Sequence, residues 1–132
     1  MFVFSNYEEI GQSGTIIEPG FSRYIAIDVA PFSENMDSRE DKVTIIAKDH
    51  GMVYDYNLVQ NIIGVAKKNE IKYAIDSYYS YSTDAETALL AGGNVEAAAL
   101  GFGTFSTHGI ERTHVDSVDS MCELLRGIIL EL

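Results

Sequence analysis

The sequence has little of several features that define whole classes of protein. Its single cysteine, Cys122, allows no disulfide within the chain, which excludes a small disulfide-stabilised scaffold. Lys and Arg are also scarce: 9 basic residues stand against 20 acidic ones, and the net charge is -11. Such a charge repels phosphate backbones and anionic headgroups, so we expect no nucleic-acid and no membrane partner.

Long apolar runs are missing as well. No stretch approaches the roughly 18 residues of a membrane span, and the apolar residues 1–4 have no basic segment ahead of them, as a signal peptide would. With one cysteine, this favours a reducing, cytoplasmic location. What is present is 46% hydrophobic and 22% charged residues over 132 positions. We therefore expect a single domain that buries roughly two-thirds of its unfolded surface.

Hydrophobic periodicity predicts strands that alternate with helices. Short apolar runs, several of them rich in β-branched residues, predict strands at 1–5, 23–30, 42–48, 72–77 and 95–101. Apolar spacings of three and four predict helices from the cap Asp55 to about 70, at 84–91, and at 117–132. This alternation predicts an α/β fold, with a mixed, largely parallel sheet and helices packed on it.

Two carboxylates, Glu8 and Glu9, stand side by side in the long polar loop 6–20. Neighbouring side chains on an extended backbone point in opposite directions, so the two could serve different centres. One could hold a metal while the other moves protons. A solvated surface pair is the alternative. Because the chain opens directly in an apolar strand before this loop, we also expect it to be cut from a longer domain.

Asp28 lies near the end of the apolar run 24–29. An unpaired carboxylate there costs several kcal/mol, so a partner must satisfy it. Ligands of open α/β sheets bind beyond the carboxyl ends of strands, which favours a metal or an active-site role. A hydrogen-bonded structural aspartate is the alternative.

His108 also follows a predicted strand, with Glu111, Arg112 and His114 nearby as supporting or ion-pair partners. Imidazole together with carboxylate suits zinc or cobalt, whereas a lone loop histidine is often only solvent-exposed. His50 has no such neighbours and is expected at the surface. We expect the strand ends to bring Glu8, Glu9, Asp28 and His108 to one sheet edge, joined there by the turn 82–84.

Four segments in order resemble the glutamyl and deblocking aminopeptidases, a family with two co-catalytic metals that forms tetrahedral particles. They are YEEIGQSG at 7–14, IAIDVAP at 25–31, STDAETA at 82–88 and THGIERTH at 107–114, with AKDHGMVYDYNLV at 47–59 also similar. The resemblance implies an aminopeptidase that removes N-terminal residues from peptides with metal-activated water. It also implies a homo-oligomer, and two zinc or cobalt ions in a complete site.

Residue by residue, the resemblance implies that Glu8 is the general base and acid. Glu9 and His108 would be ligands of one metal, and Asp28 a ligand of the other. Thr83 and Asp84 would shape the substrate end, although Tyr81 and Ser82 stand where the family has two glycines.

The sequence departs from the family's pattern on the N-terminal side of these segments. The family's further histidine ligand, its bridging aspartate and an inserted domain have no counterpart here, so the chain would be the C-terminal portion of an incomplete zinc-exopeptidase-like catalytic domain. Two other functions stay open: a non-catalytic, self-associating fragment that binds a divalent metal, and a glycoside hydrolase. A glycoside hydrolase needs two acids facing each other about 5 to 9.5 Å apart, whereas adjacent glutamates diverge.

Overall fold

The structure is a computed structural model that describes residues 1–15 and 17–132. Its strands are β1 (Arg23–Pro31), β2 (Val43–Lys48), β3 (Tyr73–Ser77) and β4 (Glu96–Thr104). Its α-helices are α1 (Tyr56–Lys68), α2 (Asp84–Leu90) and α3 (Val115–Glu131). Two short 3-10 helices, η1 (Glu8–Ile10) and η2 (Ser13–Thr15), lie near the N-terminus.

The four strands form one mixed sheet in the order β1-β4-β2-β3. β1 runs parallel to β4, β2 runs parallel to β3, and the two pairs meet through the antiparallel pairing of β2 with β4. The prediction of a mixed, largely parallel α/β sheet is therefore confirmed. β4 lies inside the sheet and is buried from Ala97 to Gly101, as its uninterrupted run of small and apolar residues predicts.

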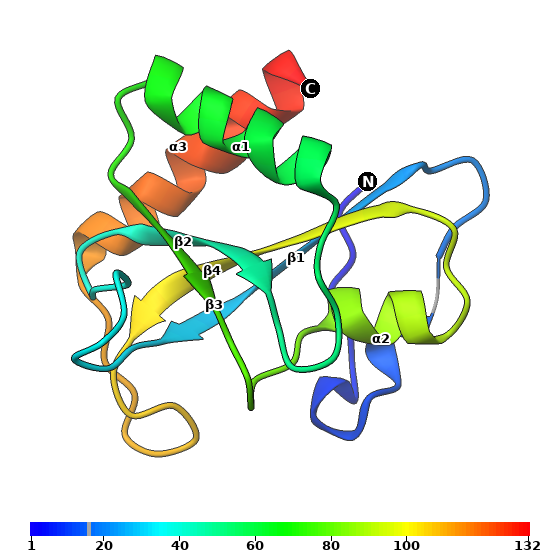
Figure 1. The fold of residues 1–132 in the computed structure, drawn as a ribbon, viewed down its shortest axis with the longest axis horizontal. Coiled ribbons are helices and arrows are strands. Elements are labelled where there is room, and N and C mark those ends of the chain that lie inside the picture. Colours follow the sequence, from blue (N-terminus) through cyan, green and yellow to red (C-terminus); the bar gives the residue numbers. More distant parts are fainter. Residues whose placement is uncertain (16) are drawn as a thin grey trace.

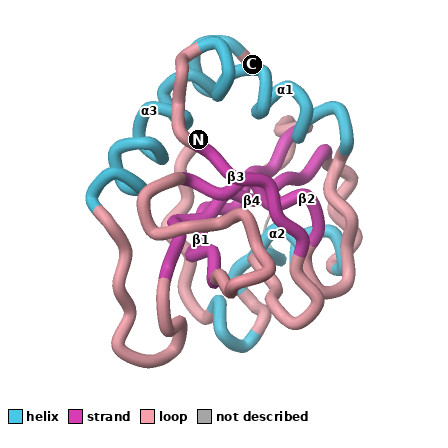
Figure 2. Tube along the Cα trace, turned by 60° about the vertical axis from the view of Figure 1, so that its left-hand side comes forward, coloured by secondary structure: helices cyan, strands magenta, loops and turns pink. Residues whose placement is uncertain are grey.

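The helices cover both faces of the sheet. α1 and α3 pack side by side on one face, while α2 and the N-terminal segment lie on the other (Figures 1 and 2). α1 begins at Asp55, whose carboxylate accepts a hydrogen bond from the Leu58 amide at 2.8 Å, so the predicted cap is confirmed. The largest fully buried apolar side chains are Ile45, Ile46, Leu58, Ile62, Leu100, Met121 and Leu124.

The N-terminal strand prediction was wrong. Residues 1–5 form no strand, and the large side chains of residues 1–4 are exposed. An apolar stretch becomes a strand only when a neighbour completes its backbone hydrogen bonds, and no described segment pairs with this one.

Most other boundaries agree within one or two residues. β4, however, continues three residues beyond the predicted end at 101, and α3 begins at Val115 rather than at 117. The reason at α3 is His114, whose Nδ1 accepts a hydrogen bond from the Asp116 amide at 3.1 Å and caps the helix. None of the described helices has the length and apolar character needed to cross a membrane.

Candidate active site

Five of the six predicted site residues line one hollow of about 560 Å³. They come from separate segments: Glu8 and Glu9 from η1, Asp28 from β1, Thr83 from the start of α2, and His108 from the loop after β4. The sixth, Asp84, lines an adjoining hollow that also reaches Glu8 and Asp28. The fold thus gathers these residues, although neither Glu8 nor Glu9 lies at a strand end as expected.

Glu9 and His108 form a pair across this hollow. The Nε2 atom of His108 lies 3.8 Å from Oε1 of Glu9, and both side chains are largely exposed. The His108 backbone is left-handed, with φ of 63°, and its amide donates to Oε1 of Glu111 at 3.0 Å. Backbone bonds between Phe105 and Arg112 close the base of this loop.

Asp28 is half-buried, and the backbone amide of the next residue satisfies one oxygen of its carboxylate. Its Oδ1 accepts a hydrogen bond from the Val29 amide at 2.6 Å. Burial raises the pKa of the Asp28 carboxyl, the neighbouring Tyr81 hydroxyl and the Val29 amide lower it, and the charges of Asp84 and Glu9 raise it further. The hydroxyl of Tyr81 donates to the Val29 carbonyl oxygen at 2.6 Å, which fixes the ring beside the carboxylate.

Glu8 lies within a group of like charges. Partial burial raises the pKa of its carboxyl first, and the negative charges of Asp28, Asp84 and Glu9 raise it further, while His108 acts in the opposite direction. Carboxylates gathered in this way favour either protonation or a bound cation. A carboxyl with a raised pKa is also suited to exchanging protons with a substrate.

Thr83 and Asp84 hold the start of α2. Thr83 is buried, and its hydroxyl accepts a hydrogen bond from the Ala85 amide at 3.2 Å, so it is the helix cap. Asp84 accepts hydrogen bonds from Ser5, at 2.9 Å, and from Ser13. Asp84 therefore ties the N-terminal segment, and with it η1, to this helix.

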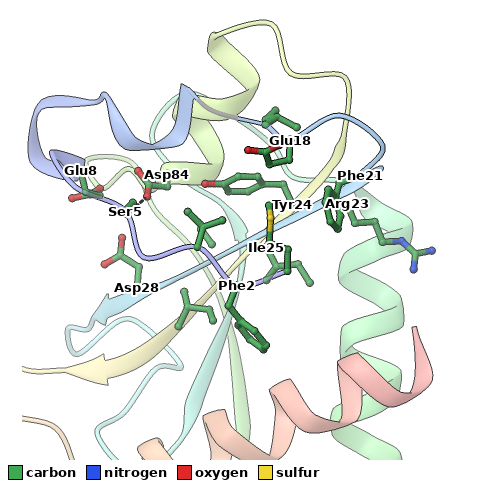
Figure 3. A pocket seen from close by; sticks show the side chains of 15 residues that line it. Phe2, Ser5, Glu8, Glu18, Phe21, Arg23, Tyr24, Ile25, Asp28 and Asp84 are labelled. Carbon is green, nitrogen blue, oxygen red and sulfur yellow. Dashed lines mark hydrogen bonds between the residues drawn. The ribbon is translucent and has the colours of Figure 1, made fainter.

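The adjoining hollow has a volume of about 310 Å³ and lies between the N-terminal residues and β1. Figure 3 shows Glu8, Asp28 and Asp84 together at one end of it, with the Tyr24 hydroxyl directed toward Asp84. The rest of it is lined by apolar side chains such as Phe2 and Ile25, and by the charged Glu18 and Arg23 at the far end. The acidic group therefore stands where two hollows meet.

A divalent metal suits these donors in chemical type, because carboxylate and imidazole are ligands of zinc and related ions. Glu9 and His108 could hold one ion, and Asp28 could bind a second. Within residues 1–15 and 17–132, however, no three His, Cys, Asp or Glu side chains converge closely enough to hold a metal. The described residues thus do not form a complete three-ligand metal centre.

The supporting residues differ from those expected. Glu111 accepts from the His108 amide, as a supporting partner should, but Arg112 pairs with Glu40 at 2.5 Å and His114 caps α3. Tyr81 and Glu86 line the hollow and were not predicted from the sequence. For Tyr81 the available signal was its position directly before the turn 82–84.

Comparison with known proteins identifies the family. Residues 1–124 match the M42 glutamyl aminopeptidases. The chain belongs to this family. A Bacillus subtilis (strain 168) relative, YhfE, whose name assigns it provisionally to the aminopeptidases, is 34% identical over 125 residues. That match covers 94% of this chain and 36% of YhfE, so the chain spans about a third of that relative's length.

Solved structures of aminopeptidases share the fold. PhTET1-12s, described as a dodecamer, superposes with a TM-score of 0.86 at 20% identity, over 98% of this chain and 41% of that one. Aminopeptidase APDkam598 from Desulfurococcus kamchatkensis gives 0.72 at 21% identity, over 82% and 34%. The expected exopeptidase-like architecture is therefore confirmed at the level of the fold.

Proposed function

We propose that the chain forms part of the active site of a metal-dependent aminopeptidase that removes N-terminal residues from peptides. The observation that carries the proposal is the shared hollow, in which Glu8, Glu9, Asp28 and His108 meet from three segments far apart in the sequence. Membership of the M42 family supports it.

In this proposal Glu9 and His108 hold one divalent ion, zinc or cobalt, and Asp28 holds another. When bound, such an ion polarises the scissile carbonyl and acidifies water. Glu8 is the proton carrier: its carboxylate takes a proton from the attacking water and then delivers one to the leaving amine. The raised pKa of Glu8 supports this role, because the proton it accepts is held more tightly than by an exposed glutamate.

The substrate end lies at Thr83 and Asp84. Asp84 lines the adjoining hollow beside Glu8 and Asp28. A protonated peptide amino terminus is attracted to such a group of carboxylates, and the apolar side chains of this hollow, such as Phe2 and Ile25, suit contact with the first side chain of the peptide.

The second candidate is a non-catalytic, self-associating fragment that binds a divalent metal without turnover. Two observations favour it: the described residues do not complete a three-ligand centre, and Met1, Phe2, Val3 and Phe4 expose large apolar side chains. Assembly into a homo-oligomer belongs to both candidates. It is supported by structural neighbours described as a dodecamer and as a tetrahedron or octahedral shell.

Hydrolysis of aminoacyl anilides with added zinc or cobalt separates the two candidates. The aminopeptidase proposal predicts turnover that Glu8→Gln reduces by at least about 100-fold, the range of general acid-base catalysis, with unchanged metal affinity. A chain that binds the ion and shows no turnover supports the second candidate. Glu123→Gln, which removes an exposed carboxyl from α3 on the opposite face of the sheet, is the matched control.

A further inference from the structure

Two carboxyl groups lie buried beside the candidate site, whose hollow Glu86 also lines. Asp49 follows β2 directly and is 0% exposed, and Glu86 stands in the first turn of α2 and is 5% exposed. Asp49 Oδ1 and Glu86 Oε2 are both buried, and neither has a hydrogen-bond partner among the described residues. Buried polar atoms rarely remain unpaired in this way.

The remaining oxygens of the pair are engaged. The Tyr54 hydroxyl donates to Asp49 Oδ2 and lies 2.7 Å from the Thr83 hydroxyl, which itself donates to Asp49 Oδ2 at 3.3 Å. The exposed His50 has its Nδ1 3.9 Å from Glu86 Oε1. Asp49 is thus linked through Tyr54 to Thr83, the residue that caps α2 at the candidate site.

Within the part of the chain that the structure describes, neither acid has a Lys or Arg ion-pair partner, and His50, 3.9 Å from Glu86, is charged only when protonated. The Lys48 ammonium group at the end of β2 bonds to the carbonyl oxygens of Asp49, His50 and Tyr78 rather than to either carboxylate. On α2 the neighbouring charge is Asp84, which is also acidic. Gly51 packs so closely that a Cβ there would clash with the Glu86 carboxylate, so there is little space beside the pair on that side.

Asp49 and Glu86 are close neighbours, because Gly51, two residues after Asp49, packs against the Glu86 carboxylate, and Thr83, three residues before Glu86, bonds to Asp49. Two buried carboxylates this close cannot both ionise without a large cost. A single proton shared between them removes one of the two buried charges. It also gives each unpaired oxygen a hydrogen-bond partner. Burial raises the pKa of Asp49 to about 6; Tyr54 lowers it, and Glu86 raises it through its charge and its hydrogen bond. The carboxyl group is therefore suited to remain protonated well above the pH at which an exposed aspartate ionises.

We propose that Asp49 and Glu86 share one proton, and that this carboxyl–carboxylate bond positions Thr83 and the first turn of α2 at the back of the candidate site. Both acids are positioning residues that act through Tyr54 and Thr83. The consequence for the peptidase site rests on the proposed function, whereas the sharing of the proton does not.

Proton sharing has a definite effect on stability. The folded pKa of Asp49 lies above its unfolded value, so the folded chain binds more protons between about pH 4 and 6. The stabilisation from the pair is fully present below that window and is lost as the pH rises through about 6. Above about pH 6 both groups are ionised, and their repulsion pushes the start of α2 away from the end of β2.

The test is the melting temperature of the metal-free chain as a function of pH, for the wild type, Glu86→Gln and the control Glu123→Gln, an exposed acid on α3. The wild type and the control should lose about 4 °C between pH 5 and pH 7 from this pair. Glu86→Gln should show a clearly smaller loss, because a glutamine amide donates to Asp49 without titrating, and only the effect of burial on Asp49 remains. A pH dependence unchanged by Glu86→Gln overturns the proposal.

A direct measurement covers the case in which Glu86→Gln does not fold. Carboxyl carbon-13 NMR of the wild type should show Asp49 titrating near pH 6, and an Asp49 midpoint near 4 overturns the proposal. Calcium or zinc that stabilises the wild type at pH 7 through this pair, and not Glu86→Gln, also overturns it, because the site would then hold a cation. Neither experiment uses substrate, so a failure of the peptidase proposal leaves its outcome unchanged.

Discussion

Thr83 serves three partners with one hydroxyl. It accepts from the Ala85 amide, lies 2.7 Å from the Tyr54 hydroxyl and donates to Asp49. Because the residue is buried, any partner left behind by a substitution lies away from water and stays unpaired. Thr83 therefore connects the candidate site to the interior.

Two substitutions distinguish what the Thr83 hydroxyl contributes to stability from what the volume of the side chain contributes. Thr83→Val keeps the volume and should lower the free energy of unfolding by about 1–3 kcal/mol, through loss of the cap and of buried hydrogen bonds. Thr83→Ser keeps the hydroxyl and should recover most of the loss. Urea unfolding followed by circular dichroism measures both, and equal losses in the two variants would contradict the interpretation.

At the residue level the sequence predicted which side chains lie together better than it predicted their surroundings. Glu8, Glu9, Asp28 and His108 were singled out because each follows a predicted strand and carries a metal-ligand or acid-base side chain, and they share one hollow although the strand expected before Glu8 is absent. Asp49 follows the buried strand β2 in the same way, so the same rule could have found it. Glu86 gave no such signal, because an acid in the first turn of a helix is common, and only tertiary packing buries it.

Among the elements, η2 and α2 pack unusually closely. A Cβ at Gly14 would clash with the carbonyl oxygen of Asp84 and lie 2.9 Å from the Thr87 side chain. This close approach brings Ser13 to Asp84 and so holds the polar loop that carries Glu8 and Glu9. A glycine is needed here for space, since its φ is not among the positive values.

Gly14→Ala should therefore destabilise the chain by about 1–3 kcal/mol, the usual cost of overpacking. The control is Gly64→Ala in the interior of α1, where an added Cβ meets nothing within 4 Å. That change should be stabilising by about 0.5–1 kcal/mol. Thermal unfolding of both variants tests the pair, and the expectation fails if Gly14→Ala is neutral.

The cap of α1 gives a second test at this scale. Asp55→Ala removes the acceptor for the Leu58 amide and should cost about 1 kcal/mol. Asp119→Ala, an exposed aspartate within α3, removes the same charge without a cap and should change stability by less than about 0.5 kcal/mol. The melting temperatures of the two variants show whether the Asp55 cap stabilises the chain. Similar shifts in both would show that the cap contributes nothing specific.

The elements themselves were largely predictable, because 23–30, 42–48 and 55–70 carry clear periodic patterns that β1, β2 and α1 then adopt. Residues 1–5 carry an apolar pattern too, but a strand depends on a partner and no local pattern supplies one. The 3-10 turn at η1 was also missed. It depends on left-handed backbone at Tyr7 and Gly11, which the sequence marks only at the glycine.

For the molecule as a whole, the exposed edge of the sheet matters. β1 is an edge strand, Ile27 on it is 44% exposed, and the apolar N-terminal residues lie nearby. Unpaired edges and apolar patches are usually covered by another chain or segment. The homo-oligomer proposed above would cover this surface.

Sedimentation should then show an assembly larger than a monomer at micromolar concentration. Ile27→Lys should shift it toward monomer, since a charge on an edge strand opposes pairing. The control, Ile110→Lys, changes a side chain that is 92% exposed in the loop after β4 and should leave the mass unchanged. A chain that is monomeric throughout would contradict the expectation.

The most direct measurement is a calorimetric zinc titration of the wild type, His108→Ala, Asp28→Ala and the control His50→Ala, with the oligomer mass taken on the same samples. His50 does not line the hollow, so its variant should bind zinc as the wild type does. We predict wild-type binding in the micromolar range or tighter, with at least about a 10-fold loss in the other two variants. Equal zinc binding by all four chains, or none by the wild type, would contradict the proposed metal centre.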